Sequence, residues 1–237
     1  MAQNLLQNFT LTFLIGLSLF GLLLVTMLAF NPPIIQESLP LRKPAIGSLF
    51  GLLCILGVLA AFFPRQCSAM FEGKSRRLDE EHFPSHGTLH TLHGHHPQCK
   101  GFSAHVFEVK NRTLCIACAG LFLGGLGAIA GTILYFFGNL HFETNATLVV
   151  VGGISGVGFG LFQFKVQRSY VRLCLNISFV LGSFLVLAGI DELVESLFVD
   201  LFLVSLSVFW LFTRILLSQW DHWRTCQTCK SICEICR

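Results

Sequence analysis

Long apolar stretches separated by short polar ones make up most of the chain. A hydrocarbon core about 30 Å thick needs roughly 20 apolar residues per helix. Six stretches come close to that length: residues 9–30, 45–63, 114–138, 147–164, 173–190 and 197–217. Because backbone groups in lipid must be satisfied internally, each stretch is expected to be a helix. The pattern therefore predicts an all-α membrane protein with about six transmembrane helices.

Three of these segments have alternatives. Segments 147–164 and 173–190 are short and contain polar or small residues, so a re-entrant pair is an alternative to two full spans. The first segment has the length of a signal peptide. It lacks the basic region and the small-x-small cleavage site of such a peptide, and a membrane span is the favoured interpretation.

Composition and charge support a membrane protein and orient it. Hydrophobic residues make up 53% of the 237 positions and charged residues 12%, about half the charged share of a soluble domain. With six spans, all of the 16 Lys and Arg except Arg42 and Lys43 lie on one side of the membrane. By the positive-inside rule, both termini and the middle loop are expected in the cytoplasm, in a multi-pass protein of the cell membrane.

The order of polar and apolar segments suggests four parts. These are a two-helix transmembrane hairpin (1–64), a cytoplasmic His/Cys-rich loop (65–113), a four-helix transmembrane unit (114–217) and a cytoplasmic Cys-rich tail (218–237). Besides lipid, the expected partners are subunits of a membrane complex or a second copy of the chain, and no nucleic acid.

Glycines recur at helical spacing in the third and fourth segments, in the sets Gly120/Gly124, Gly127/Gly131 and Gly152/Gly156/Gly160. Such small-xxx-small patterns let helix backbones approach closely, within one chain or between two. The alternative is a substrate groove lined by exposed backbone.

Charged side chains are rare within the predicted spans. Asp200 and Arg214 lie near opposite ends of the last one, where snorkelling or an interfacial contact is the expected explanation. Asp191, Glu192 and Glu195 cluster where the last two spans meet. A proton or cation pathway would need charge near the bilayer centre, where the sequence places none, and this weakens an interpretation as an ion-coupled transporter.

The middle loop carries the strongest indication of metal chemistry. Residues 105–109 have strand character, residues 110–112 are expected to turn, and residues 113–114 can return as a second strand. This hairpin would bring Cys99 or His105 beside a C-x-x-C pair. Zinc takes four thiolate or imidazole ligands, and C-x-x-C supplies two from one turn. The predicted zinc ligands are Cys99, His105, Cys115 and Cys118, with His96 as the substitute for His105. The alternative is that the two C-x-x-C thiols merely pack at the start of the helix.

Two other segments have weaker metal signatures. The tail carries Cys226, Cys229, Cys233 and Cys236, which suggest a second site for zinc or an iron–sulfur cluster. Acylation and simple packing beside Trp220 and Trp223 are alternatives for these thiols. The histidine-rich tract in residues 82–96 is interpreted as a solvated polar loop, with a second metal as the alternative.

The run Cys-Ile-Ala-Cys-Ala-Gly-Leu-Phe-Leu-Gly from Cys115 resembles the DUF2085 family of uncharacterised prokaryotic integral membrane proteins. Members carry C-x-x-C-[TA]-G-x-[YF]-L-G at the start of a membrane helix, after a Cys/His-Pro-x-x-x-Phe element that reads His-His-Pro-Gln-Cys-Lys-Gly-Phe here. Histidines stand where the first cysteine of the family is expected, and Cys99 follows. The resemblance covers about residues 93–127. It implies a Cys/His site in a small helical membrane protein and no known reaction.

The expected function is that of a non-enzymatic membrane protein with a cytoplasmic metal site, either structural or handling electrons or metal for a membrane complex. A transporter is one alternative, supported by the glycine-rich helices. A zinc-dependent membrane enzyme is another, with Glu108 as the candidate base near the site. No H-E-x-x-H or comparable catalytic motif occurs in the sequence.

Overall fold

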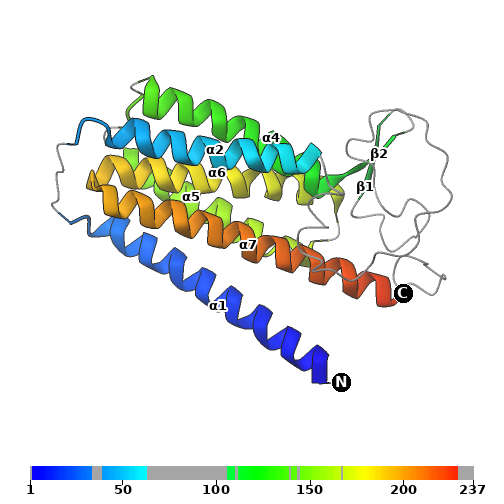
Figure 1. Ribbon diagram of the computed structural model, residues 1–237. Coiled ribbons are helices and arrows are strands. Elements are labelled where there is room, and N and C mark those ends of the chain that lie inside the picture. The colour runs from blue at the N-terminus through cyan, green and yellow to red at the C-terminus, as the bar shows by residue number, and fades with distance from the viewer. Residues whose placement is uncertain are drawn as a thin grey trace, which may run out of the picture.

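The computed structural model describes residues 2–33, 39–62, 106–109, 112–138, 140–142, 145–166 and 168–228. In that part of the chain, six α-helices form one bundle (Figure 1). They are α1 (Ala2–Phe30), α2 (Arg42–Phe62), α4 (Ile116–Thr132), α5 (Ala146–Leu161), α6 (Ser169–Val194) and α7 (Leu197–Thr228). A π-helical turn, η2 (Ile133–Phe137), extends α4, and a 3-10 turn, η4 (Gln163–Lys165), follows α5.

A two-stranded antiparallel hairpin precedes α4, as the sequence predicted. Strand β1 (Val106–Val109) pairs with β2 (Arg112–Cys115), and Val106 lies opposite Cys115 in the register. The predicted start of the third helix at residue 114 is wrong, because residues 113–115 belong to the strand and α4 begins at Ile116. Because β2 ends at Cys115, the C-x-x-C pair lies at the junction of strand and helix.

Five helices are long and apolar enough to cross a membrane: α1, α2, α4 with η2, α6 and α7. These confirm five of the six predicted spans. The remaining one, α5, has 16 residues and is about 24 Å long at 1.5 Å per residue, less than the hydrocarbon core. Helix α6 has 26 residues, so the expectation that the fifth segment is short is wrong.

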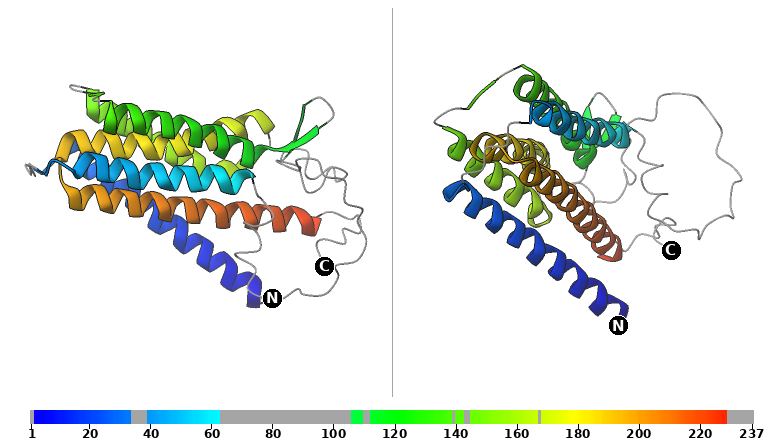
Figure 2. Two further views of the ribbon diagram at one scale, coloured as in Figure 1. Left: turned by 45° about the horizontal axis from the view of Figure 1, so that its top comes forward. Right: turned by 60° about the vertical axis from the view of Figure 1, so that its left-hand side comes forward.

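Helix α6 is the most buried of the spanning helices and lies between α4 and α5. Helix α2 packs on α4, whereas α1 packs on α5 and α7, on the other side of the bundle (Figure 2). Polar contacts join α1 to α7: Ser18 Oγ donates to Thr213 Oγ1 at 3.2 Å, and Trp210 Nε1 donates to the Ser18 carbonyl oxygen at 3.2 Å. The first two helices therefore pack mainly on different helices, although both contact α7.

The predicted glycine rows pack inside the chain, against α6. A Cβ atom on Gly156 would lie 2.6 Å from the Ser178 carbonyl oxygen, and one on Gly153 would lie 2.8 Å from the Gly182 carbonyl oxygen. Gly120 faces Asn176 at a similarly short distance, whereas Gly152 has no neighbouring atom within 4 Å. The glycines thus allow α4 and α5 to approach α6 closely, which confirms the predicted close packing of helices.

An apolar cavity of about 160 Å³ lies between α2, α4, α6 and α7. Gly57 and Gly125 are among its lining residues, but no glycine of the predicted rows lines it among the described residues. The glycine rows therefore serve helix packing, and they give no support to the alternative of a backbone-lined substrate groove.

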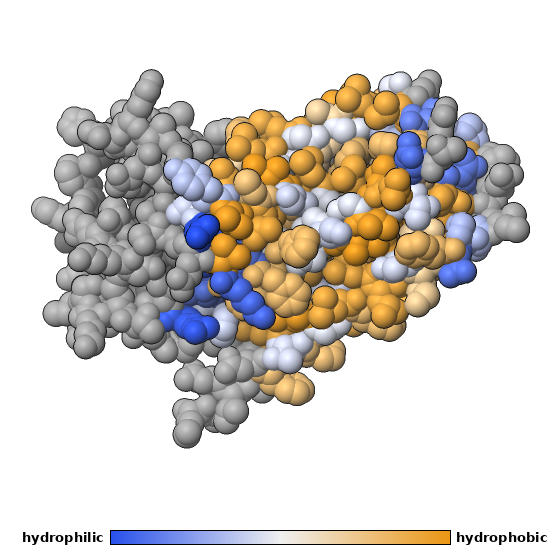
Figure 3. Space-filling model, turned by 180° about the vertical axis from the view of Figure 1, so that it is seen from behind, coloured by the Kyte–Doolittle hydropathy of each residue, from blue (hydrophilic) through white to orange (hydrophobic). Residues whose placement is uncertain are grey.

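The surface of the bundle matches a membrane environment. On the face shown in Figure 3, apolar residues cover the middle, and hydrophilic residues gather towards the ends. Large side chains such as Phe20, Leu148 and Phe198 are exposed on this belt of helices. Such exposure would be unfavourable in water and is expected where lipid covers the surface.

The two ends of the bundle carry different chemistry. The start of α1, the β1–β2 hairpin and the end of α7 lie at one end, which we call the hairpin end (Figures 1 and 2). The end of α1, the start of α2 and the turn between α6 and α7 lie at the opposite end, which we call the far end. Each end holds a cluster of polar side chains inside the bundle.

Candidate functional site

The C-x-x-C pair lies at the hairpin end, where β2 meets α4. Cys115 is the last residue of β2 and precedes α4, and Cys118 lies in the first turn of that helix. Both are thiols at partly exposed positions, and a hydrogen bond joins their sulfur atoms. The fold thus brings the two thiols of the C-x-x-C pair together on one turn, as the sequence predicted.

Local contacts favour the thiolate form of Cys115. Its pKa is lowered from the usual value to about 6, chiefly by the hydrogen bond from Cys118. Burial opposes this shift, while the backbone N–H groups of Cys118 and Ala117 and the positive charge of Arg214 add to it. Because the thiolate is the form of cysteine that binds metal, this chemistry fits a zinc ligand.

A polar network inside the bundle lies close to the thiols. Arg214 of α7 is 2% exposed and donates through Nη2 to Asn176 Oδ1 of α6, while its Nε has no hydrogen-bond partner among the described residues. Asn176 Nδ2 donates to the Arg172 carbonyl oxygen at 2.8 Å, and Arg172 Nη2 lies 3.1 Å from Asp221 Oδ2. The predicted snorkelling of Arg214 is wrong, because its guanidinium is buried between helices.

The other predicted ligands fall outside the described residues. This applies to Cys99, His105 and His96, to the histidine tract, and to the tail residues Cys229, Cys233 and Cys236. Cys226 belongs to the last turn of α7, and Glu108 pairs with Thr113 in the hairpin. Within the described ranges, no group of three or more His, Cys, Asp or Glu side chains is arranged to hold a metal. The full ligand set stays a prediction.

The far end holds a second cluster, centred on Arg42 in the first turn of α2. Arg42 Nη1 donates to Asp191 Oδ1 of α6 at 2.5 Å and also to Asp200 Oδ2 of α7. All three side chains are buried. The expected interfacial position of Asp200 is therefore wrong, since this carboxylate lies inside the bundle and shares one guanidinium nitrogen with Asp191.

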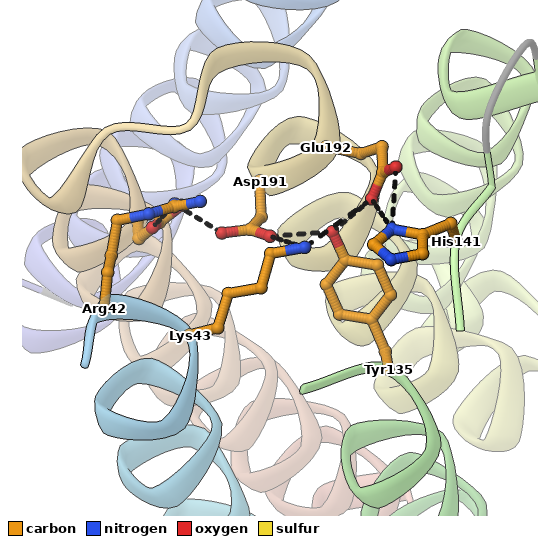
Figure 4. Close-up of polar contacts among 7 residues, drawn as sticks. Arg42, Lys43, Tyr135, His141, Asp191 and Glu192 are labelled. Atoms are coloured by element: carbon orange, nitrogen blue, oxygen red, sulfur yellow. Dashed lines mark hydrogen bonds and ion pairs between the residues drawn. The ribbon is translucent and has the colours of Figure 1, made fainter. Parts of the chain in front are cut away.

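A line of polar side chains connects Asp191 to the surface (Figure 4). The Tyr135 hydroxyl lies 2.7 Å from Asp191 Oδ2 and 2.8 Å from Glu192 Oε2. Glu192 Oε1 lies 3.1 Å from Nδ1 of His141, whose side chain is about half exposed. Lys43 Nζ lies 3.8 Å from Asp191 Oδ2 and 3.9 Å from Glu192 Oε2. The line runs from the surface through Glu192 and Tyr135 to the buried aspartates.

The sequence indicated the acidic residues of this cluster, but it did not predict that they contact Arg42 and Tyr135. Arg42 entered the charge count as a loop residue, and Tyr135 was not singled out. The one available signal was that both positive charges on the far side, Arg42 and Lys43, sit at the start of a span. Opposite charges at the same membrane level are expected to pair when their helices are neighbours.

Family models, curated protein sequences and solved structures were compared with the chain, and none of them matches it.

Proposed function

We propose that this chain is a multi-pass membrane protein that binds one zinc ion at the hairpin end of its bundle. Cys115 and Cys118 provide two ligands, and Cys99 and His105 from the loop provide the others, with His96 as the substitute for His105. The observation that carries the proposal is the placement of two contacting thiols at the junction of the hairpin and α4. Zinc sites with C-x-x-C use this kind of turn.

The electrostatics of the hairpin end support a thiolate site. A zinc ion with three thiolates and one imidazole carries a net negative charge. Arg214 brings a buried positive charge near Cys115 through a helix that is distant in sequence. Burial of the Arg214 charge is costly, and a metal–thiolate centre nearby would offset that cost.

The role that this arrangement supports best is structural. Cys115 and Cys118 are attached to α4, whereas Cys99 and His105 belong to the loop that precedes the hairpin. A metal bound by both sets would fasten the loop to the bundle, and binding energy would become folding energy of the loop. With the positive-inside rule, we place this end in the cytoplasm, where thiols stay reduced.

Metal analysis of the purified full chain tests the proposal. We expect one zinc per chain in the wild type and loss of zinc in Cys115→Ser and Cys118→Ser. Cys174→Ser is the matched control, because Cys174 lies exposed on α6 and should leave the zinc in place. Unchanged zinc in both C-x-x-C variants, or no metal in the wild type, would contradict the proposal.

Preparation without oxygen, followed by an optical spectrum, separates zinc from iron. A zinc–thiolate site is colourless in the visible range, whereas an iron–sulfur cluster absorbs there and contains sulfide. Visible absorption that persists in Cys115→Ser but disappears in Cys229→Ser would assign iron to the tail and leave the C-x-x-C pair to zinc.

A further inference from the structure

The far-end cluster contains more buried negative than buried positive charge. Two carboxylates, Asp191 and Asp200, share the guanidinium of Arg42, and all three side chains are buried. Lys43 is the nearest other cation, but it is partly exposed and lies 3.8 Å from Asp191, where it also faces Glu192 at 3.9 Å. Among the described residues, the buried trio therefore carries one uncompensated negative charge if both carboxylates are ionised.

The two carboxylates differ in their hydrogen bonds. Asp191 accepts a hydrogen bond on each oxygen, from Arg42 on Oδ1 and from Tyr135 on Oδ2. Asp200 accepts one on Oδ2, whereas its Oδ1 is buried and has no hydrogen-bond donor within the part of the chain that the structure describes. An ionised oxygen without a donor is costly in a buried site, and two like charges side by side add to that cost.

We propose that the Asp191–Asp200 pair is a proton-binding site that holds one proton, placed on Asp200, in the folded protein. A proton on Asp200 leaves Asp191 ionised against Arg42 and makes the buried trio neutral. The position of Asp200 in the first turn of α7 favours its ionised form, but a helix terminus is a smaller effect than an unpaired buried charge. A metal cation fits less well, because Arg42 already occupies the space between the carboxylates.

The site has a route to the aqueous phase at the far end. The Tyr135 hydroxyl lies between Asp191 and Glu192, so it can accept a proton from one side and donate its own to the other. Glu192 continues the line to His141, which is half exposed. The proton passes first from Asp200 to Asp191, whose side chains are in hydrogen-bonding contact. Each further step moves a proton across one hydrogen bond, so one O–H or N–H bond breaks as the next one forms. The proposal does not depend on the metal at the other end.

Among the described residues, the charged or titratable groups that face the pair belong to three neighbouring elements. Arg42 and Lys43 come from α2, Tyr135 comes from η2, and Glu192 follows Asp191 in α6. Helix α1 and the described part of α5 bring no charged side chain.

Infrared spectroscopy of the full chain in detergent tests the assignment. A protonated carboxyl group gives a carbonyl stretch that is separate from carboxylate bands and shifts in D₂O. We expect this band in the wild type at neutral pH, its loss in Asp200→Asn, and its retention in Glu195→Gln. Glu195 is the matched control, because it is an exposed carboxylate at the same end.

Asparagine has the shape of a protonated aspartate, so Asp200→Asn is expected to fold and to unfold at a temperature close to that of the wild type. Absence of the band from folded wild-type protein at neutral pH would overturn the proposal, as would a band that Asp200→Asn leaves unchanged. Failure of Asp200→Asn to fold would overturn it too, because that result requires an ionised Asp200.

Tyr135→Phe tests the route separately. The phenyl ring keeps the packing but removes the hydroxyl between Asp191 and Glu192. We expect the carbonyl band to persist and its exchange from H₂O to D₂O to slow by about tenfold, the effect of one lost hydrogen bond on a barrier. Exchange as fast as in the wild type would overturn the route through Tyr135.

Discussion

Cys115 combines the two features that make a thiol a ready metal ligand, namely a neighbouring sulfhydryl donor and nearby positive charge. Its pKa of about 6 lies below that of an unperturbed cysteine, about 8.5, because Cys118, backbone N–H groups and Arg214 stabilise the thiolate. In metal-free protein we expect alkylation of Cys115 to reach half of its maximal rate near pH 6. Mass spectrometry of the alkylated peptide would measure this.

The lowered pKa of Cys115 also determines how this thiol changes the stability of the fold with pH. The folded protein releases the Cys115 proton more readily than the unfolded chain, so this group stabilises the metal-free fold above about pH 8.5, and that contribution is lost as the pH falls through about 6. Cys118→Ala removes the largest cause and should move the alkylation midpoint to higher pH. An unchanged midpoint would show that the thiol contact does not stabilise the thiolate.

Arg42 and Lys43 are adjacent in sequence but differ sharply in burial, with side chains 4% and 29% exposed. Arg42→Met leaves buried carboxylates without their donor and should lower the free energy of unfolding by about 3–5 kcal/mol. Lys43→Met, the control, removes a partly exposed charge and should cost less than about 1 kcal/mol. Denaturation in detergent, followed by circular dichroism, compares the two. An equal loss of unfolding free energy in the two variants would mean that burial does not determine how much each charge contributes to stability.

Arg42 also shows which contacts between single residues could not be predicted from the sequence. Arg42 binds carboxylates that lie 149 and 158 positions away in the chain, so no local pattern contains the contact. Asp200 and Arg214 read as interfacial because each lies near the end of a span. Their burial depends on which helices are neighbours, and hydropathy does not encode that arrangement.

At the scale of elements, the approach of α5 to α6 depends on glycine. In Gly156→Ala, the added Cβ meets the Ser178 carbonyl oxygen of the α6 backbone at 2.6 Å, so the helices must separate. We expect a loss of about 1–3 kcal/mol in unfolding free energy. Gly152→Ala lies on the same helix with no atom within 4 Å, and it should be neutral or slightly stabilising.

Thermal unfolding of the two alanine variants in one detergent provides the comparison. A Gly156→Ala protein as stable as Gly152→Ala would mean that the two helices pack more loosely than the structure shows. Restoration of stability by a second change on α6 is not expected, because the obstructing atom belongs to the backbone.

Elements were the part of the fold that the sequence predicted best. Apolar length located the helices because membrane spans need continuous apolar runs, and the strand pattern of residues 105–114 anticipated the hairpin. Two features of the fold were not predicted. Hydropathy does not distinguish an α-helical from a π-helical turn at Ile133–Phe137, because the run is equally apolar in either conformation. It also overestimated the fourth span, since Phe162 and the turn η4 (Gln163–Lys165) lie beyond the end of α5 at Leu161.

At the scale of the whole molecule, the alternation of helices predicts the side on which each turn lies. An epitope inserted after Asn145 or Glu195 should be stained in intact cells, whereas one inserted after Arg168 should be stained only after permeabilisation. All three positions are exposed, so the insertions should be tolerated. Staining of the tags at 145 and 168 on the same side would show that the short helix α5 does not cross.

At this scale, the sequence predicted one part of the candidate site, and only the structure showed the other. The C-x-x-C pair was predicted because its spacing is local and its chemistry is strong. The far-end cluster was not predicted as a unit, because it gathers Arg42, Tyr135, Asp191 and Asp200 from four elements. Both described polar clusters lie towards the ends of the bundle, and the expected absence of charge near the bilayer centre stays a prediction.

The short helix α5 also reduces the hydrophobic thickness of one side of the bundle. Its 16 residues are about 24 Å long at 1.5 Å per residue, and it exposes the apolar side chains of Leu148 and Phe159. This length is shorter than a bilayer core of about 30 Å. A thick bilayer would have to thin around the protein, at a cost of fractions of a kcal/mol per ångström of mismatch. Reconstitution in phosphatidylcholines of increasing acyl length should therefore lower the melting temperature step by step, and the protein should accumulate where the membrane is thin.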